Sequence, residues 1–210
     1  MTVLSKMVYD YPVLAPCEAD INSAFLQLKT TYQNGGKVLV CGNGGSAADS
    51  EHIVGELMKG FMQQRKLPEA DCAKIKAAAG NHGEYICDNL QGALPAISLV
   101  SQSAIVSAFA NDVAADMVFA QQVYGYGKKG DCLIGLSTSG MAKNVYFAMH
   151  TAKALGLSTI GLTGSSGGAL KGICDITICA PSDSTPKIQE YHLPIYHTLC
   201  MMIEEELFGA

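Results

Sequence analysis

The chain has 210 residues, of which 49% are hydrophobic and only 16% charged, and its formal net charge is −5. This length suits one domain with its own core, and an acidic balance without a basic stripe argues against nucleic-acid binding. The apolar runs are shorter than a membrane span, and the opening MTVLSKMVYDYP lacks the apolar stretch of a signal peptide. We therefore expect a cytoplasmic protein without membrane contact, and the low charge predicts that part of its surface is buried between subunits.

The eight cysteines indicate buried thiols and not disulfides. No CxxC pair occurs, and five of the cysteines lie within apolar runs, where cysteine behaves as a small hydrophobic residue: Cys41, Cys132, Cys174, Cys179 and Cys200. Reduced, mostly buried thiols fit the cytoplasm.

The first part of the chain predicts a helix, a strand and a second helix. Apolar residues at helical spacing favour a helix over residues 17–32, which Asn34-Gly35-Gly36 ends. The apolar run at residues 38–41 predicts a strand, and GNGGS follows it, with Ser46 as the expected cap of a helix that reaches Phe61. Residues 63–91 predict little beyond a short helix at 70–79 and interrupt the alternation of strands and helices.

The remaining chain alternates apolar strands with helices. Strands are expected at residues 94–100, 131–136, 158–163 and 176–180. Helices are expected at residues 103–110, 116–126, 144–155 and 187–208, with a turn at Asn111-Asp112 and an interruption at Pro194. This order predicts a three-layer α/β sandwich with a five-stranded parallel sheet, an N-terminal helix and a long C-terminal helix. We expect a single domain over residues 1–210, with a helical segment at 1–36 and an insertion at 63–92.

Two turns rich in glycine and hydroxyl groups follow predicted strands. The first contains Asn43, Gly44 and Ser46, and the second is Ser137-Thr138-Ser139-Gly140. Ligands of parallel sheets bind at the carboxyl ends of strands, and short donors at helix starts suit a phosphate. Either turn alone could be a simple strand-to-helix connection or a helix cap. Together they favour a phosphate ester, and the absence of a P-loop lysine disfavours ATP or GTP.

Four polar residues form two helical pairs. His52 and Glu56 are one turn apart, and Gln189 and His197 are two turns apart on the last helix. By themselves His52 and Glu56 would be a solvated surface pair. Together the four could bind a divalent metal, or they could equally supply an acid and a base for proton transfer. His192 lies off the face of the last pair and is expected to be a surface or packing residue.

These motifs together resemble the sugar isomerase (SIS) domain family and, within it, the phosphoheptose isomerase branch. The matching segments are CGNGGSAADSEHIVGEL, FANDVAADMVF, LIGLSTSG, GLTGSSGG and KIQEYHLPIYHTLCMMIEEEL. The SxSG motif alone marks the wider superfamily, whereas GNGGSAADxxH with IQExH and a second histidine is more specific. The resemblance implies a flavodoxin-like fold and a homotetramer with active sites at subunit interfaces, which the low charge and the apolar last helix would suit.

The resemblance also implies an aldose–ketose isomerase. Its expected reaction converts sedoheptulose 7-phosphate to D-glycero-D-manno-heptose 7-phosphate through an enediol, with Glu56 and His197 matching the catalytic pair. The positions that match substrate-binding residues are Asn43, Gly44, Ser46, Asn111, Asp112, Ser137, Thr138, Ser139 and Gln189. The zinc found in some members would be held by His52, Glu56, Gln189 and His197.

Three departures from the family pattern leave alternatives open. Met141-Ala142 stands where the SxSG loop usually continues with Asn-Ser, so one phosphate hydroxyl is missing. Residues 63–91 are longer than the usual link, and Pro194 makes the shared face of Gln189 and His197 only approximate. The alternatives are another phosphosugar substrate, or a non-catalytic SIS module that binds a phosphosugar or docks on a protein.

Overall fold

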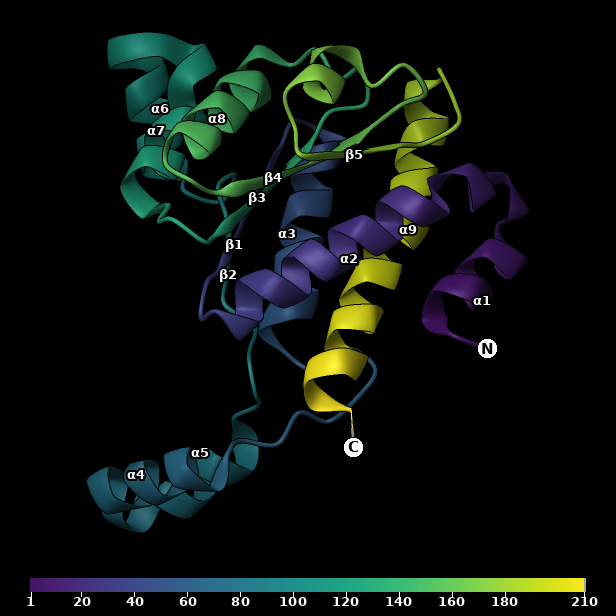
Figure 1. The fold of residues 1–210 in the computed structure, drawn as a ribbon. Coiled ribbons are helices and arrows are strands. Elements are labelled where there is room, and N and C mark those ends of the chain that lie inside the picture. The colour runs from purple at the N-terminus through teal and green to yellow at the C-terminus, as the bar shows by residue number, and fades with distance from the viewer. Residues whose placement is uncertain (210) are drawn as a thin grey trace.

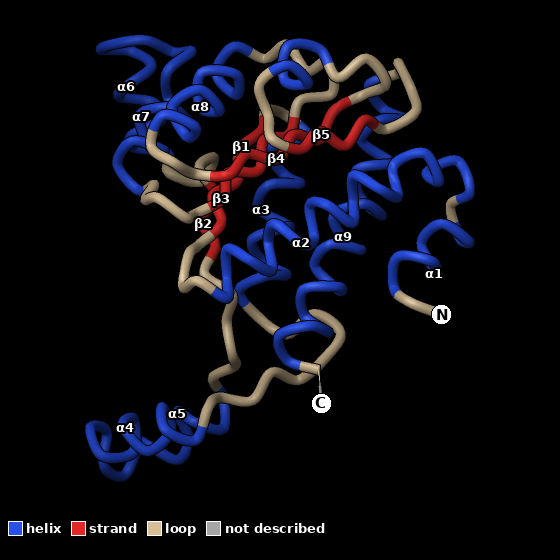
Figure 2. Tube along the Cα trace, in the orientation of Figure 1, coloured by secondary structure: helices blue, strands red, loops and turns tan. Residues whose placement is uncertain are grey.

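Five parallel strands form one sheet, in the order β2–β1–β3–β4–β5, in the computed structural model, which describes residues 1–209 (Figure 2). The strands are β1 (Val38–Gly42), β2 (Ala96–Ser98), β3 (Cys132–Leu136), β4 (Ser158–Thr163) and β5 (Ile176–Cys179). The predicted strands and their parallel pairing are confirmed. β2 is shorter than predicted because the N–H of Leu94 donates to the carbonyl of Leu57 at a helix end, and not to a neighbouring strand.

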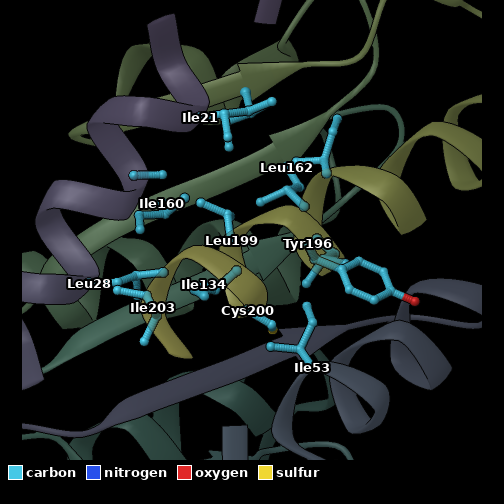
Figure 3. Close-up of a cluster of buried hydrophobic side chains, with 14 of the residues drawn as sticks. Ile21, Leu28, Ile53, Ile134, Ile160, Leu162, Tyr196, Leu199, Cys200 and Ile203 are labelled. Carbon is cyan, nitrogen blue, oxygen red and sulfur yellow. The ribbon is translucent and has the colours of Figure 1, made fainter. Parts of the chain in front are cut away.

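Four helices lie on one side of the sheet, three of them against it and the N-terminal one packed on the C-terminal one (Figure 1). They are α1 (Val3–Asp10), α2 (Glu18–Gln33), α3 (Gly45–Met58) and α9 (Thr185–Phe208), with a 3₁₀ turn, Pro12–Cys17, between α1 and α2. Figure 3 shows the core beneath them, where Ile134 and Ile160 of the sheet lie among Leu28 of α2, Ile53 of α3 and Leu199 of α9. These side chains are almost fully excluded from water, and their burial is the main force that holds the helices on the sheet.

The opposite face is covered by α7 (Val118–Tyr126) and α8 (Lys143–Ala154). Successive side chains of a strand leave on opposite faces of a sheet. Leu39 and Leu133 therefore point to this second layer, where they join Val123 of α7 and Met149 of α8. Helices on both faces confirm the predicted three-layer α/β sandwich.

The segment between β2 and β3 stays helical where the sequence predicted a turn. α6 (Ser103–Phe109) continues through a π-helical turn (Ala110–Ala114) and a 3₁₀ turn (Ala115–Met117) into α7. Asn111 donates to the Asp112 carboxylate at 2.7 Å, so the two side chains satisfy each other and do not cap a helix end. By length and composition alone, Ser103–Tyr126 is the one helical run within residues 1–209 that could cross a membrane, although the inner side of α7 packs on the sheet.

α9 runs unbroken through Pro194, contrary to the interruption that we expected. A proline removes one helix hydrogen bond, but Pro194, Ile195 and Tyr196 are all buried, and this packing keeps the helix continuous. The apolar side chains of α9 mostly face the chain's own core.

Residues 63–91 contain a helical hairpin that stands away from the sandwich (Figure 1). It consists of α4 (Glu69–Ala79), a 3₁₀ turn (Gly80–His82) and α5 (Gly83–Asn89). No side chain of α4 is buried. Its two ends meet where the N–H of Gly92 donates to the carbonyl of Arg65 at 2.8 Å.

Candidate active site

The first glycine-rich turn brings a helix start to the carboxyl end of β1. Gly44 has φ 57° and is the N-cap of α3, in a conformation that residues with a side chain rarely adopt. Ser46, which we had expected to be the cap, lies instead in the first turn of α3, because the chain already enters the helix at Gly45. The positive end of the helix dipole therefore faces the space above the sheet.

That space is a pocket of about 310 Å³ between the two predicted phosphate turns. β1 and β3 are neighbours in the sheet, so the turns that follow them meet at one edge. The pocket is lined by Asn43, Gly44, Gly45, Ser46, Leu136, Ser137, Thr138, Ser139, Ala142, Thr185 and Gln189. Every predicted substrate-binding residue is in this set except Asn111 and Asp112, which are exposed on the π-helical turn.

The second turn is arranged so that its hydroxyl groups can donate. Ser137 Oγ accepts the N–H of Ala142 at 3.4 Å, and Ser139 Oγ accepts the N–H of Met141 at 3.2 Å. Each oxygen thus has a backbone donor, and its own proton remains for an anion in the pocket. Gly140, at φ 65°, lies so close to the Gly167 carbonyl that a Cβ would be 2.1 Å from its oxygen, so the loop depends on glycine there.

Asn144 is a site residue that the sequence did not reveal. Its side-chain amide exchanges two hydrogen bonds of 2.9 Å with the amide of Asn43. This pair joins the first turn to the start of α8 and fixes which way the Asn43 amide points. The one sequence feature that could have pointed to Asn144 is its position shortly after the SxSG loop.

A second group of side chains lies farther along α3 and α9. Nε2 of His52 is 3.4 Å from Oε1 of Glu56 and 3.5 Å from Nε2 of His197. The other oxygen of Glu56, Oε2, accepts from Lys59 Nζ at 3.0 Å. The predicted catalytic pair, Glu56 and His197, thus meets around His52, and Lys59 is a further neighbour that the sequence analysis missed although it lies three residues after Glu56.

The surroundings of His197 favour its neutral ring. Burial, followed by the neighbouring His52, lowers the pKa of His197, and these effects outweigh the opposing influence of Glu56. The Phe61 ring covers it at a centroid distance of 5.2 Å. A neutral imidazole has a lone pair that can accept a proton or bind a metal ion.

Three of the four predicted zinc ligands are neighbours, and the fourth is separate. Two ligands of a tetrahedral zinc ion with bonds of about 2.0–2.1 Å lie ~3.3 Å apart. The distances from Nε2 of His52 to Glu56 and to His197, 3.4 and 3.5 Å, are close to this value. Gln189 instead packs on Gly45 in the phosphate pocket. Within residues 1–209, no group of three or more His, Cys, Asp or Glu side chains is positioned to hold a metal ion.

Comparison with known proteins agrees with this fold. Residues 13–92 and 90–164 match the SIS domain. The chain belongs to the SIS domain family. It is 40% identical over 178 residues to a protein named phosphoheptose isomerase from Clostridium acetobutylicum, covering 85% of this chain and 78% of that protein. A phosphoheptose isomerase from Burkholderia pseudomallei is 36% identical over 207 residues, which cover 99% of this chain and 90% of that protein.

Solved structures of SIS family members share the whole fold. The phosphoheptose isomerase of Francisella tularensis superposes with a TM-score of 0.74 and 30% identity, covering 98% of this chain and all of that chain (100%). The phosphoheptose isomerase of Neisseria gonorrhoeae gives a TM-score of 0.70 and 27% identity, covering 97% of this chain and 100% of that chain. The predicted family is confirmed, together with its phosphoheptose isomerase branch.

Proposed function

We propose that this chain is a phosphosugar isomerase that converts sedoheptulose 7-phosphate to D-glycero-D-manno-heptose 7-phosphate. The proposal rests on one observation, which is that the same two helices, α3 and α9, contribute residues to both the phosphate pocket and the group around His52. α3 and α9 both line the phosphate pocket at their N-terminal ends, and both contribute to the group around His52. A sugar phosphate held at one end therefore has its other end available to an acid and a base.

The phosphate group of the substrate is bound in the pocket between the two glycine- and hydroxyl-rich turns. The hydroxyls of Ser46, Ser137, Thr138 and Ser139 and the N-terminal end of α3 are its donors. The amides of Asn43 and Gln189 line the same pocket and reach toward the sugar hydroxyls.

The reaction requires one proton transfer at each of two carbons and one at each of their oxygens, and we assign these transfers to Glu56 and His197. A base removes a proton from C1 of the ketose while the C2 carbonyl oxygen gains one, which gives the enediol. A proton then returns to C2, and the C1 hydroxyl loses its proton to leave an aldehyde. Glu56 is 9% exposed, so water has little access to its carboxylate, and neutral His197 can accept a proton and return it.

A divalent metal, which we expect to be zinc, suits the same residues. His52, Glu56 and His197 would be three of its ligands, whereas Gln189, the predicted fourth, lies in the phosphate pocket. When bound, the ion would polarise the substrate carbonyl. The separations of 3.4 and 3.5 Å from Nε2 of His52, close to the spacing of two ligands on one zinc ion, support this assignment.

We also propose a homotetramer located in the cytoplasm. Asn111 and Asp112 lie outside the phosphate pocket of their own chain, so a role for them in sugar binding requires the pocket of another subunit. Large apolar side chains are exposed along the same segment: Ile105, Val113, Met117, Tyr124 and Tyr126. Contacts between copies would cover them.

The direct test is turnover of sedoheptulose 7-phosphate, followed as aldose formation with and without added zinc. Turnover that is absent under both conditions would exclude this substrate. The alternative of a non-catalytic binding or docking module is favoured by Ala142, which lines the pocket where the family usually has a hydroxyl. A pure binder would bind the sugar phosphate equally well as wild type and as Glu56→Gln, and neither protein would turn it over.

A further inference from the structure

We propose that Asp49 and Tyr196 are positioning residues that fix the tautomer of His52, with the proton on Nδ1 and the lone pair on Nε2. The proposal rests on the proposed function for its catalytic consequence, but the tautomer itself can be measured independently. It assigns a role to two residues outside the predicted catalytic, substrate-binding and metal-binding sets.

Tyr196 lies between the carboxylate and the imidazole. Its hydroxyl is 2.9 Å from Nδ1 of His52 and 3.3 Å from Oδ1 of Asp49. The side chain is 2% exposed. Figure 3 shows its ring at the margin of the aliphatic core, with the hydroxyl pointing away from Ile53 and Leu199. The core therefore holds the ring, and the hydroxyl has two polar partners.

The directions of these two hydrogen bonds follow from the chemistry of the partners. Tyr196 donates its single hydroxyl proton to Oδ1 of Asp49, an oxygen that as a carboxylate can only accept. The phenol oxygen then has only lone pairs to offer His52, and Nδ1 must be the donor. Neutral His52 is therefore protonated on Nδ1, and its Nε2 has the lone pair.

The contacts on the other side of the ring do not oppose this assignment. Nε2 of His52 is 3.4 Å from Oε1 of Glu56 and 3.5 Å from Nε2 of His197, both longer than the 2.9 Å between Nδ1 and the Tyr196 hydroxyl. Lys59 donates to Oε2 of Glu56 at 3.0 Å, so Oε1 is the carboxylate oxygen that faces Nε2 of His52. The one short bond of His52 is made by Nδ1.

This tautomer suits the proposed chemistry. The lone pair of Nε2 faces both Glu56 and His197, which is where a metal ion or a proton would have to be accepted. Partners behind a histidine fix its orientation and basicity, and their loss typically reduces metal affinity or activity by about 10–100-fold.

The experiment compares wild type, Tyr196→Phe and the control Tyr191→Phe by ¹⁵N NMR of histidine-labelled, metal-free protein. Tyr191 is on the same helix, and its substitution removes the same atom, but its ring packs under Lys187 Nζ, 5.0 Å away, and not beside His52. We expect Nδ1 of His52 to carry the proton in wild type and Tyr191→Phe. In Tyr196→Phe the proton should shift toward Nε2, the form that free neutral histidine prefers.

Activity is then measured on the same proteins. We expect kcat of Tyr196→Phe to fall about 10-fold or more, with KM nearly unchanged because the phosphate pocket is not altered. A wild-type His52 protonated on Nε2 would overturn the tautomer assignment, and this result needs no variant to fold. A shifted tautomer with unchanged kcat would overturn the positioning role. If wild type proves inactive, the proposed function fails, whereas the NMR result still decides the tautomer.

Discussion

Arg65 and Glu204 form a fully buried ion pair, with Nε of Arg65 2.8 Å from Oε1 of Glu204. Arg65 also donates to the carbonyl of Glu56 at 2.9 Å, and Glu204 accepts the N–H of Phe61 at 2.7 Å. Burial alone would raise the pKa of Glu204, but backbone hydrogen bonds and Arg65 outweigh this effect and lower it. The pair therefore ties the end of the helix with Glu56 to the helix with His197.

The first prediction concerns this pair. Glu204→Gln should reduce the free energy of unfolding by about 3 kcal/mol or more, because it leaves the Arg65 guanidinium buried without a counter-charge. Urea denaturation measures the change. Glu205→Gln is the matched control, since Glu205 is the exposed neighbour, and its effect should stay within about 0.5 kcal/mol. Equal stability of the two variants would contradict the structural role of the pair.

The second prediction separates catalysis from binding at Glu56. Glu56→Gln keeps the size of the side chain but removes the basic carboxylate, so kcat should fall by about 10²–10⁴-fold. The affinity for sedoheptulose 7-phosphate, measured by calorimetry, should change little because the phosphate is bound elsewhere. Glu51→Gln on the exposed side of the same helix should leave kcat unchanged. Loss of binding and folding together in Glu56→Gln would mean that Glu56 is structural.

Much of the fold could be predicted because its signals are local. The strands follow from short apolar runs, and the two turns from consecutive glycines and hydroxyls, and parallel strands necessarily bring both turns to one sheet edge. The exact cap was missed because Gly44, Gly45 and Ser46 all suit a helix start, and only the observed φ of Gly44 decides among them.

Contacts between distant parts of the chain could not be predicted in the same way. Asn43 and Asn144 are 101 residues apart, and Arg65 and Glu204 are 139 apart. Nothing in either local sequence specifies its partner, since the pairing depends on how the helices pack on the sheet. The unbroken course of α9 through Pro194 has the same origin, because burial outweighs the local effect of proline.

The third prediction concerns the missing hydroxyl at Ala142. This residue lines the phosphate pocket and is also the N-cap of α8, where it makes no side-chain cap. In Ala142→Ser, the new oxygen can accept a helix N–H and its proton can donate to phosphate. We expect stability to rise by about 1 kcal/mol and KM to fall about 2–10-fold, as one hydrogen bond would give.

The control for Ala142→Ser is inhibition by inorganic phosphate, which should tighten by the same factor as KM. Thermal unfolding of the free protein measures the capping effect separately. A more stable variant with unchanged KM and unchanged phosphate inhibition would show that the pocket does not bind the phosphate group.

The fourth prediction concerns the α4–α5 hairpin. No side chain of α4 is buried, and the hairpin ends already meet at Arg65 and Gly92. Replacing residues 67–90 with a short Gly/Ser linker should therefore lower the far-UV circular dichroism only by the contribution of α4 and α5, and leave the midpoint of thermal unfolding nearly unchanged. Arg65 must be kept because it pairs with Glu204. A large drop in the unfolding midpoint at low protein concentration would show that the hairpin supports its own chain's core.

The fifth prediction is a pH dependence of stability that arises from His192. This side chain is fully buried, and Nε2 lies 3.1 Å from the Thr163 carbonyl, to which its N–H donates. Burial lowers the pKa of His192 below 6.5, and the hydrogen bond to Thr163 only partly opposes this. The folded protein thus binds a proton at His192 less readily than the unfolded chain does.

The sign of the effect follows from this difference. The stabilising contribution is fully present above about pH 6.5, the pKa of unfolded histidine, and is lost as the pH falls through the lower folded value. In that window the free energy of unfolding should fall by up to about 1.4 kcal/mol per pH unit. His192→Gln keeps an N–H donor but cannot titrate there, so urea denaturation at pH 7.5 and at pH 5.5 should give a smaller difference for it than for wild type. His82→Gln, on the exposed hairpin turn, should keep the wild-type difference, and an unchanged slope in His192→Gln would assign the acid sensitivity to another group.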